Sequence, residues 1–171
     1  MAALPARLTV VSPVKTRSIE TEVWLPKPPE TVFAFFADAR NLAALTPPWL
    51  RFSILPPTPI QMKQGALIDY RLRPRGIPIH WQSEKTAWEP PHRFVDEQRR
   101  GPYRRWIHEH TFVERDGGTL ARDRVQYAVP GGSLVNYLFV ARDLKRVFAF
   151  RQETPRRIFE QGAGERGVAT R

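Results

Sequence analysis

The sequence contains no cysteine among its 171 residues. This absence excludes disulfide bonds, thiolate metal sites and cysteine nucleophiles. Because disulfides persist in oxidising compartments, a chain without cysteine is compatible with a reducing one, and we expect a cytoplasmic protein. Its stability must then come from packing, and a chain of this length can bury a substantial core.

Long hydrophobic runs are also missing. Residues 1–11 hold too short an apolar run for a signal peptide, and no small-residue cleavage site follows. The most apolar helical stretch, residues 137–150, is interrupted by four charged residues at positions 142, 143, 145 and 146. A helix with so many charges does not cross a bilayer, so we expect no stable membrane insertion.

Acidic residues are outnumbered, with 17 Asp and Glu against 27 Lys and Arg and a formal net charge of +10. Such an excess can indicate binding to nucleic acid or to an anionic membrane surface. The basic residues are mostly arginine and are scattered along the chain, and no known nucleic-acid-binding motif is present. We therefore expect a solvated basic surface and no nucleic-acid partner.

The length fits one domain. We expect a flexible leader at residues 1–15, a folded domain at 16–160 and a disordered tail at 161–171. Residues 16–25 alternate apolar and polar side chains, which is typical of a strand. Six further strands are predicted at residues 50–55, 67–73, 77–88, 93–98, 104–114 and 119–129.

Helices are predicted on both sides of these six strands. Pro28-Pro29-Glu30 starts the first helix, because proline is tolerated in a first turn and glutamate suits the N-terminal dipole. Asp38 is expected to cap a second short helix that reaches Leu45. After a Gly-Gly pair, Ser133 is expected to cap a long helix, which Pro155 should end or kink.

The order of these elements predicts an α+β fold. A strand, two short helices, six antiparallel strands and one long helix can form a seven-stranded antiparallel curved sheet wrapped around the C-terminal helix. The two short helices follow the first strand. This arrangement leaves a gap between sheet and helix, and we expect an internal cavity there that binds a ligand.

The most informative segment is the hairpin of residues 104–129. Trp106, His108, His110 and Phe112 share one face of the first strand because side chains alternate with period two. Asp116-Gly117 favours a two-residue turn that pairs residue 115 with residue 118. His110 then faces Asp123, His108 faces Val125 and Trp106 faces Tyr127. In these three pairs, two aromatic rings, two imidazoles and a carboxylate come together, which suits a pocket wall better than a dry core.

The same alternation turns further side chains toward the cavity from other strands. Pairing of strands 77–88 and 93–98 sets Ser83 opposite Gln98 and Lys85 opposite Asp96. The second pair is either an ion pair in the pocket or a salt bridge at the rim, and we favour the rim. The long helix adds its apolar stripe. The predicted ligand-binding residues are Tyr70, Trp81, Ser83, Trp106, His108, His110, Phe112, Asp123, Val125, Tyr127, Leu144 and Phe148.

His110 with Asp123 is the one catalytic candidate. A carboxylate that accepts a hydrogen bond from an imidazole fixes the tautomer of the imidazole and raises its basicity, which suits a general base. The same pair could equally anchor a ligand carbonyl or hydroxyl, or be structural. His108, His110 and Asp123 also have the residue types of a metal site. We nevertheless predict no metal and no cofactor.

The chain resembles the SRPBCC superfamily, the START-like or helix-grip proteins related in fold to the birch-pollen allergen, and among them small bacterial stand-alone members. The segments that carry the resemblance are residues 29–36, 41–42, 46–50, 65–70, 76–81, 89–96 and 101–112. The resemblance implies a deep pocket for a hydrophobic or aromatic molecule. Carriers, receptors, cyclases and ring-hydroxylating dioxygenases share this fold, so fold alone does not fix chemistry.

Two chemistries known among similar proteins have no counterpart in these residues. No strand-linked glycine-rich fingerprint for a dinucleotide is present, and the iron-ligand spacing of the dioxygenases is absent. Three hypotheses follow, in order of preference. The first is a non-enzymatic protein that binds a small hydrophobic or aromatic, lipid-like or polyketide-like molecule. The second is a cyclase, aromatase or dehydratase using His110 and Asp123. The third is a basic adaptor for nucleic acid or a membrane surface.

Overall fold

A computed structural model describes residues 15–55 and 60–164 of the chain. The expected leader, apart from its last residue, and positions 165–171 of the expected tail lie outside the described residues. None of the helices within the described ranges is both long and apolar enough to span a bilayer.

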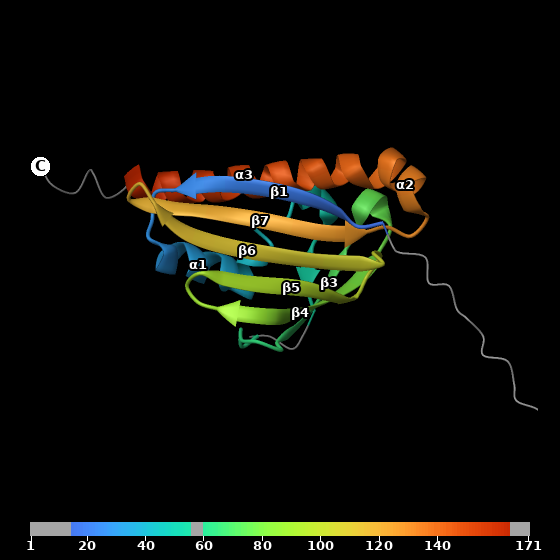
Figure 1. Cartoon of the computed structure of the whole chain (residues 1–171), viewed down its shortest axis with the longest axis horizontal. Coiled ribbons are helices and arrows are strands. Elements are labelled where there is room, and N and C mark those ends of the chain that lie inside the picture. The colour runs from blue at the N-terminus through green and yellow to red at the C-terminus, as the bar shows by residue number, and fades with distance from the viewer. Residues whose placement is uncertain (1–14, 56–59, 165–171) are drawn as a thin grey trace, which may run out of the picture.

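Within the described residues, one antiparallel sheet of seven strands forms the body of the protein, in the order β1-β7-β6-β5-β4-β3-β2. The long C-terminal helix runs along this curved sheet, as Figure 1 shows. The predicted fold class is therefore confirmed. The strands are β1 (Arg17–Leu25), β2 (Ser53–Ile54), β3 (Leu67–Leu72), β4 (Ile79–Glu89), β5 (Arg93–Arg100), β6 (Arg105–Arg115) and β7 (Gly118–Ala128).

The helical elements lie between β1 and β2, before β4 and after β7. Asp38 caps the second helix as expected, by accepting a 2.8 Å hydrogen bond from the Arg40 backbone N–H. The elements are α1 (Pro29–Ala37), the 3-10 turns η1 (Ala39–Leu42), η2 (Pro48–Leu50) and η3 (Pro74–Gly76), α2 (Gly132–Val135), the π-helical turn η4 (Asn136–Val140) and α3 (Ala141–Gly164).

The β6–β7 hairpin has the predicted register. Asp116 and Gly117 both have positive φ angles, 50° and 72°, as the two-residue turn requires, and Arg115 pairs with Gly118. His110 consequently lies opposite Asp123. The predicted pairing of β4 with β5 is also confirmed at Lys85 and Asp96, although the register shifts on either side of this pair.

Four local expectations need correction. The predicted strand 50–55 shortens to β2, because η2 occupies residues up to Leu50 and Arg51 takes a left-handed conformation (φ 45°). The predicted second helix is only the 3-10 turn η1, ending at Leu42. The C-terminal helix begins at Gly132, and Ser133 makes no capping bond, since its hydroxyl accepts from Arg17 instead.

The fourth correction concerns Pro155, which does not end the C-terminal helix. The helix continues to Gly164, so residues 161–164 are helical where a tail was expected. Proline inside a helix costs about 3 kcal/mol. Pro155 is itself fully buried, and one turn later Phe159 packs on Phe35 with ring centroids 5.2 Å apart. Burial of these side chains offsets the lost hydrogen bond.

Candidate ligand-binding site

A cavity of about 390 Å³ lies between the sheet and the start of the C-terminal helix. Strands β3 and β4 supply one wall, β6 another, and η4 with α3 the cover. Most of the lining side chains are apolar, including Ile68, Leu72, Ile79, Val140 and Val147. Such a space, largely apolar with a few convergent polar groups, is the usual form of a small-molecule site.

Aromatic rings form the inner wall. Trp81 of β4 stacks on Tyr70 of β3, with ring planes 16° apart and centroids 5.9 Å apart, and meets Trp106 edge-on at 5.2 Å. The Trp81 indole N–H donates to the Ser83 hydroxyl at 3.1 Å, and Tyr70 shares a 3.1 Å hydrogen bond with the same hydroxyl. Burial raises the pKa of Tyr70, so its phenol stays protonated. The wall therefore consists of a nearly parallel pair of rings, Tyr70 and Trp81, with Trp106 set edge-on against it, and its polar tips are neutral.

A buried ion pair forms part of the cavity floor. Lys85 Nζ lies 2.9 Å from Asp96, and the Lys85 side chain is only 3% exposed. Burial would raise the pKa of Asp96, but the Lys85 ammonium and His110 outweigh it and hold that pKa well below its usual value. The favoured prediction of a salt bridge at the rim is wrong, and the alternative of an ion pair in the pocket is correct. The period-two alternation that points Trp81 and Ser83 inward carries Lys85 inward as well.

A second buried pair joins the helix to the sheet. Arg151 of α3 lies 3.4 Å from Asp123 of β7, and both side chains are 11% exposed. Burial opposes ionisation of Asp123, yet His110 and Arg151 together lower its pKa far below the usual value. Sequence reasoning did not single out Arg151. Its position in the sequence could have indicated this role, because Arg151 follows Leu144 by seven residues, or two helical turns, and so lies on the same predicted apolar face of the helix.

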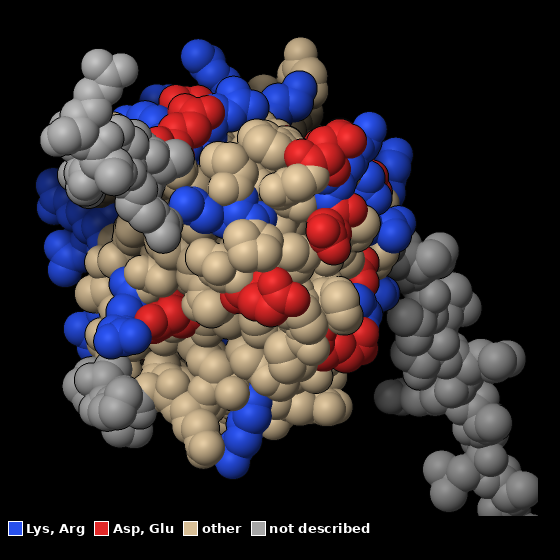
Figure 2. All heavy atoms as spheres, turned by 90° about the vertical axis from the view of Figure 1, so that its left-hand side faces the viewer, with Lys and Arg blue, Asp and Glu red and all other residues tan. Residues whose placement is uncertain are grey.

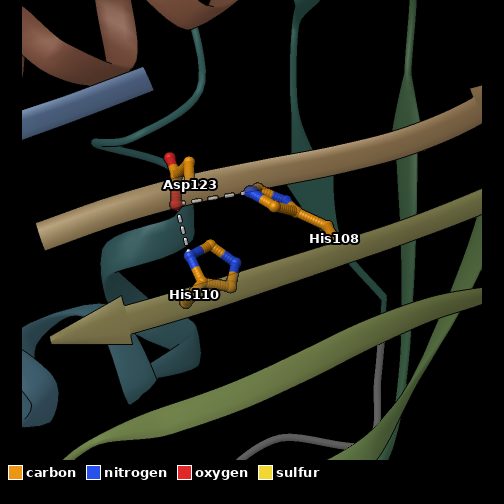
Figure 3. A group of neighbouring side chains, drawn as sticks. All are labelled: His108, His110 and Asp123. Carbon is orange, nitrogen blue, oxygen red and sulfur yellow. Dashed lines mark ion pairs between the residues drawn. The ribbon is translucent and has the colours of Figure 1, made fainter. Parts of the chain in front are cut away.

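Two histidines meet at Asp123, as Figure 3 shows. Asp123 Oδ1 lies 2.6 Å from His110 Nδ1 and 3.3 Å from His108 Nε2. His110 also approaches Asp96 at 3.6 Å, so the contacts Lys85–Asp96–His110–Asp123–Arg151 form one continuous network. Burial and neighbouring His110 lower the pKa of His108 to about 4, so His108 is neutral near pH 7.

The predicted site residues divide into two groups. Those that line the cavity are Tyr70, Trp81, Ser83, Trp106, His108, Leu144 and Phe148. Those that the structure places elsewhere are His110, Phe112, Asp123, Val125 and Tyr127.

Physical reasons explain the second group. His110 is covered by Phe94, whose ring stacks on the imidazole with centroids 4.2 Å apart. Phe112 belongs to an apolar core beneath α1. Val125 and Tyr127 pack in a second apolar cluster with side chains of α3. The expected catalytic pair of His110 and Asp123 thus lies one layer behind the cavity surface, and His108 is the imidazole that reaches the cavity.

The two histidines and Asp123 have the donor types of a metal site. One ligand atom from each lies within 4.8 Å of the others. However, Arg151 already neutralises Asp123, and Lys85 neutralises Asp96 beside His110. A divalent cation here would add buried charge next to two fixed cations. The arrangement therefore favours a network of ion pairs and imidazoles over a metal centre.

Comparison with known proteins identifies the class. Residues 25–152 match the family model described as polyketide cyclase / dehydrase and lipid transport. The chain belongs to this family, within the SRPBCC helix-grip superfamily that the sequence resembled. Among curated proteins, none matches the chain.

Solved structures share the fold. Protein Ms6760 from Mycobacterium smegmatis is 18% identical, with a TM-score of 0.63 over 88% of this chain and 98% of its own. The Zhui aromatase/cyclase from Streptomyces sp. R1128 is 16% identical, with a TM-score of 0.65 over 86% of this chain and 95% of its own.

A third likeness covers only part of a larger protein. The nucleoside-diphosphate sugar epimerase from Corynebacterium glutamicum is 26% identical, with a TM-score of 0.61 over 80% of this chain but 28% of its own. That activity belongs to a protein more than three times longer than the matched part. The family description names both polyketide cyclases and lipid transport. Family membership therefore does not distinguish an enzyme from a carrier, and the distinction must rest on the residues of the cavity.

Proposed function

We propose that the protein binds one small, largely apolar molecule in the cavity and releases it unchanged. The observation that carries this proposal is the combination of an apolar cavity of about 390 Å³ with an aromatic wall, in which Trp81 and Tyr70 are nearly parallel and Trp106 meets Trp81 edge-on. Removing apolar surface from water contributes about 25 cal/mol per Å², so such walls supply most of the affinity. Flat rings favour an aromatic or polycyclic guest.

The polar floor selects the guest's functional group. Lys85 is paired with Asp96, and Arg151 is paired with Asp123, so both cations already have a carboxylate partner. A guest carboxylate would have to lose its hydration without gaining a free cation, which is unfavourable. A carbonyl or hydroxyl can accept from Ser83 or Tyr70 at no such penalty. The preferred guest is therefore neutral, with one polar end.

A matched ligand pair tests this proposal. Titration of 2-acetylnaphthalene and of 2-naphthoate, followed by tryptophan fluorescence, compares a ketone with a carboxylate on the same ring system. We expect saturable quenching by the ketone and at least about tenfold weaker binding of the carboxylate. Asp96→Asn frees the Lys85 ammonium and should narrow or reverse this preference. Weak, non-saturable quenching by both compounds contradicts the proposal.

One observation favours a second candidate, an enzyme of cyclase or dehydratase type. His108 lines the cavity, contacts Asp123 and is neutral, so it can accept a proton from a carbon next to a carbonyl, although its pKa of about 4 makes it a weak base. A linear 1,5-diketone tests it: aldol ring closure forms one carbon–carbon bond and then releases one water, giving a cyclohexenone. If the protein accelerates this reaction and His108→Ala abolishes turnover while ketone binding persists, the enzyme replaces the carrier as the better account.

A further inference from the structure

Five large apolar side chains are exposed together at one end of the protein. Four lie on the short segment formed by α2 and η4, where Leu134 is 67% exposed, Tyr137 79%, Leu138 52% and Phe139 50%. The fifth, Ile77 after η3, is 64% exposed. We call these residues, Ile77, Leu134, Tyr137, Leu138 and Phe139, the mouth patch. Contiguous exposed apolar side chains of this size mark an interaction surface more often than they mark ordinary surface.

The mouth patch borders the opening of the cavity on the side of Ile77 and Phe139. Ile77 and Phe139 line the cavity and are also half or more exposed, so the cavity reaches the surface between them. Arg75 crosses this opening, because its guanidinium lies 5.6 Å from the Phe139 ring centroid and 3.1 Å from Asp143. Any partner that covers the mouth patch therefore also covers the path of the guest.

Basic side chains dominate the two segments that carry the mouth patch. Residues 71–79 and 130–146 together contain six basic residues and one acidic residue, Asp143. The basic residues are Arg71, Arg73, Arg75, Arg142, Lys145 and Arg146. The opposite end of the protein differs, because Figure 2 shows acidic and basic side chains side by side there.

We propose that the mouth patch docks reversibly on an anionic lipid bilayer. An apolar surface flanked by cations is the form of an interfacial membrane site, in which apolar side chains enter the headgroup layer and basic ones meet anionic lipids. Docked this way, the cavity opens toward the bilayer, and an apolar guest passes between them without crossing water. A second copy of this chain fits less well, because a two-fold contact through the mouth patch would bring together the basic segments 71–79 and 130–146 of both copies.

Vesicle co-sedimentation tests this surface. The probes are vesicles of phosphatidylcholine alone and of phosphatidylcholine mixed equally with phosphatidylglycerol, at low and at physiological salt. We expect binding to the anionic vesicles only, weakening as salt rises. The double variant Leu134→Ser/Leu138→Ser should lose about tenfold in affinity. Arg142→Glu should lose about tenfold as well, through reversal of one charge near the surface.

Matched controls sit at the far end of the β6–β7 hairpin. Val113→Ser removes a side chain that is 58% exposed, and Arg115→Glu makes the same charge change as Arg142→Glu. Both control variants should bind vesicles like the unaltered protein. Absence of binding to anionic vesicles, equal loss in the control variants, or binding unchanged by the Leu134/Leu138 substitutions would each overturn the proposal. So would self-association that those substitutions remove without any vesicle binding.

Membrane docking and guest binding are separable in these experiments. None of Leu134, Leu138 and Arg142 lines the cavity, so their variants should bind 2-acetylnaphthalene in vesicle-free buffer like the unaltered protein. Loss of vesicle binding with intact ketone binding supports the surface and leaves the proposed function standing. Absence of ketone binding together with docking through the mouth patch would reject the proposed function alone.

Discussion

The inner face of the sheet supports two different interiors, and strand β6 crosses from one to the other. At one end Trp106 and His108 border the cavity; at the other Phe112 lies in an apolar core, 2% exposed. In that core Phe33 of α1 meets Phe112 with centroids 5.5 Å apart and Phe94 at 5.7 Å. The ion-pair network around His110 lies between the two interiors.

This contrast shows that alternation along a strand decides which side chains point inward but not what they meet. Where α1 covers the sheet, its phenylalanines interdigitate with those of β5 and β6 and close the space. Where η4 and the start of α3 cover the sheet, they supply Val140, Leu144 and Val147, which leave a cavity beside the tryptophans. We call the apolar core beneath α1 the closed half of the interior and the cavity its open half. The ion-pair network around His110 forms the border between them.

The largest expected effect comes from opening the closed half. Phe112→Ala removes a fully buried ring and should lower the free energy of unfolding by about 3–5 kcal/mol. Trp106→Ala, on the same face of the same strand, removes a ring that already borders open space, and should cost less than about 2 kcal/mol while weakening ketone binding. Urea unfolding followed by circular dichroism measures both. Equal destabilisation by the two variants would contradict the comparison.

Breaking an ion pair at the border between the two halves should lower the free energy of unfolding slightly less than Phe112→Ala does. Asp123→Asn leaves the buried Arg151 guanidinium without its carboxylate partner, and should lower the free energy of unfolding by about 3 kcal/mol. The double variant Asp123→Asn/Arg151→Gln removes the stranded charge and should recover part of the loss. If the double variant is as unstable as the sum of the single ones, Asp123 and Arg151 do not act as a pair.

Protonation of His108, which lies beside the ion-pair network, should lower the free energy of unfolding in mild acid. His108 is neutral in the folded protein because its pKa is lowered from 6.5 to about 4. A lowered folded-state pKa gives stability that is complete above the unfolded value and is lost as pH falls through the folded value. Stability should therefore decline between about pH 6.5 and 4, by up to about 3 kcal/mol.

Urea unfolding at several pH values in this range measures that decline. His108→Gln should show a flatter dependence on pH between 6.5 and 4, since it removes the titrating group. Below that range both proteins should lose further stability, because Asp96 and Asp123 have pKa values below their usual ones and favour the ionised state. An unchanged slope in His108→Gln would reject the assignment to His108.

The smallest effect is expected at the mouth of the open half. Arg75→Ala removes an ion pair whose arginine side chain is 56% exposed, so the free energy of unfolding should change by less than about 1 kcal/mol. Association and dissociation of 2-acetylnaphthalene should both accelerate, because Arg75 spans the opening. Stopped-flow fluorescence measures the two rates. Unchanged rates would place the guest's path elsewhere.

Much of this architecture could be predicted from the sequence. The alternation of residues 104–112 and the Asp116-Gly117 turn fix the β6–β7 register, because a slip of one residue would turn every inward side chain outward. The same rule brings Lys85 opposite Asp96. Residues close in sequence, with strong local signals, were therefore placed correctly.

The remainder depended on contacts between distant segments. Burial of Lys85 needed the Asp96 carboxylate and the covering helix, since charged residues are rarely buried unless paired. The choice of His108 over His110 at the cavity surface depended on where Phe94 packs. Continuation of the helix past Pro155 depended on the partner of Phe159, which lies on α1. No local pattern encodes these three outcomes.

The most direct test of the central claim is calorimetric titration of 2-acetylnaphthalene into three proteins: the unaltered chain, Val147→Trp and Val113→Trp. Val147 lines the cavity, whereas Val113 is exposed on the hairpin, so the same substitution fills the open half in one variant only. The account predicts one saturable site in the unaltered chain and in Val113→Trp, and its loss in a folded Val147→Trp. Undiminished binding by Val147→Trp would contradict it.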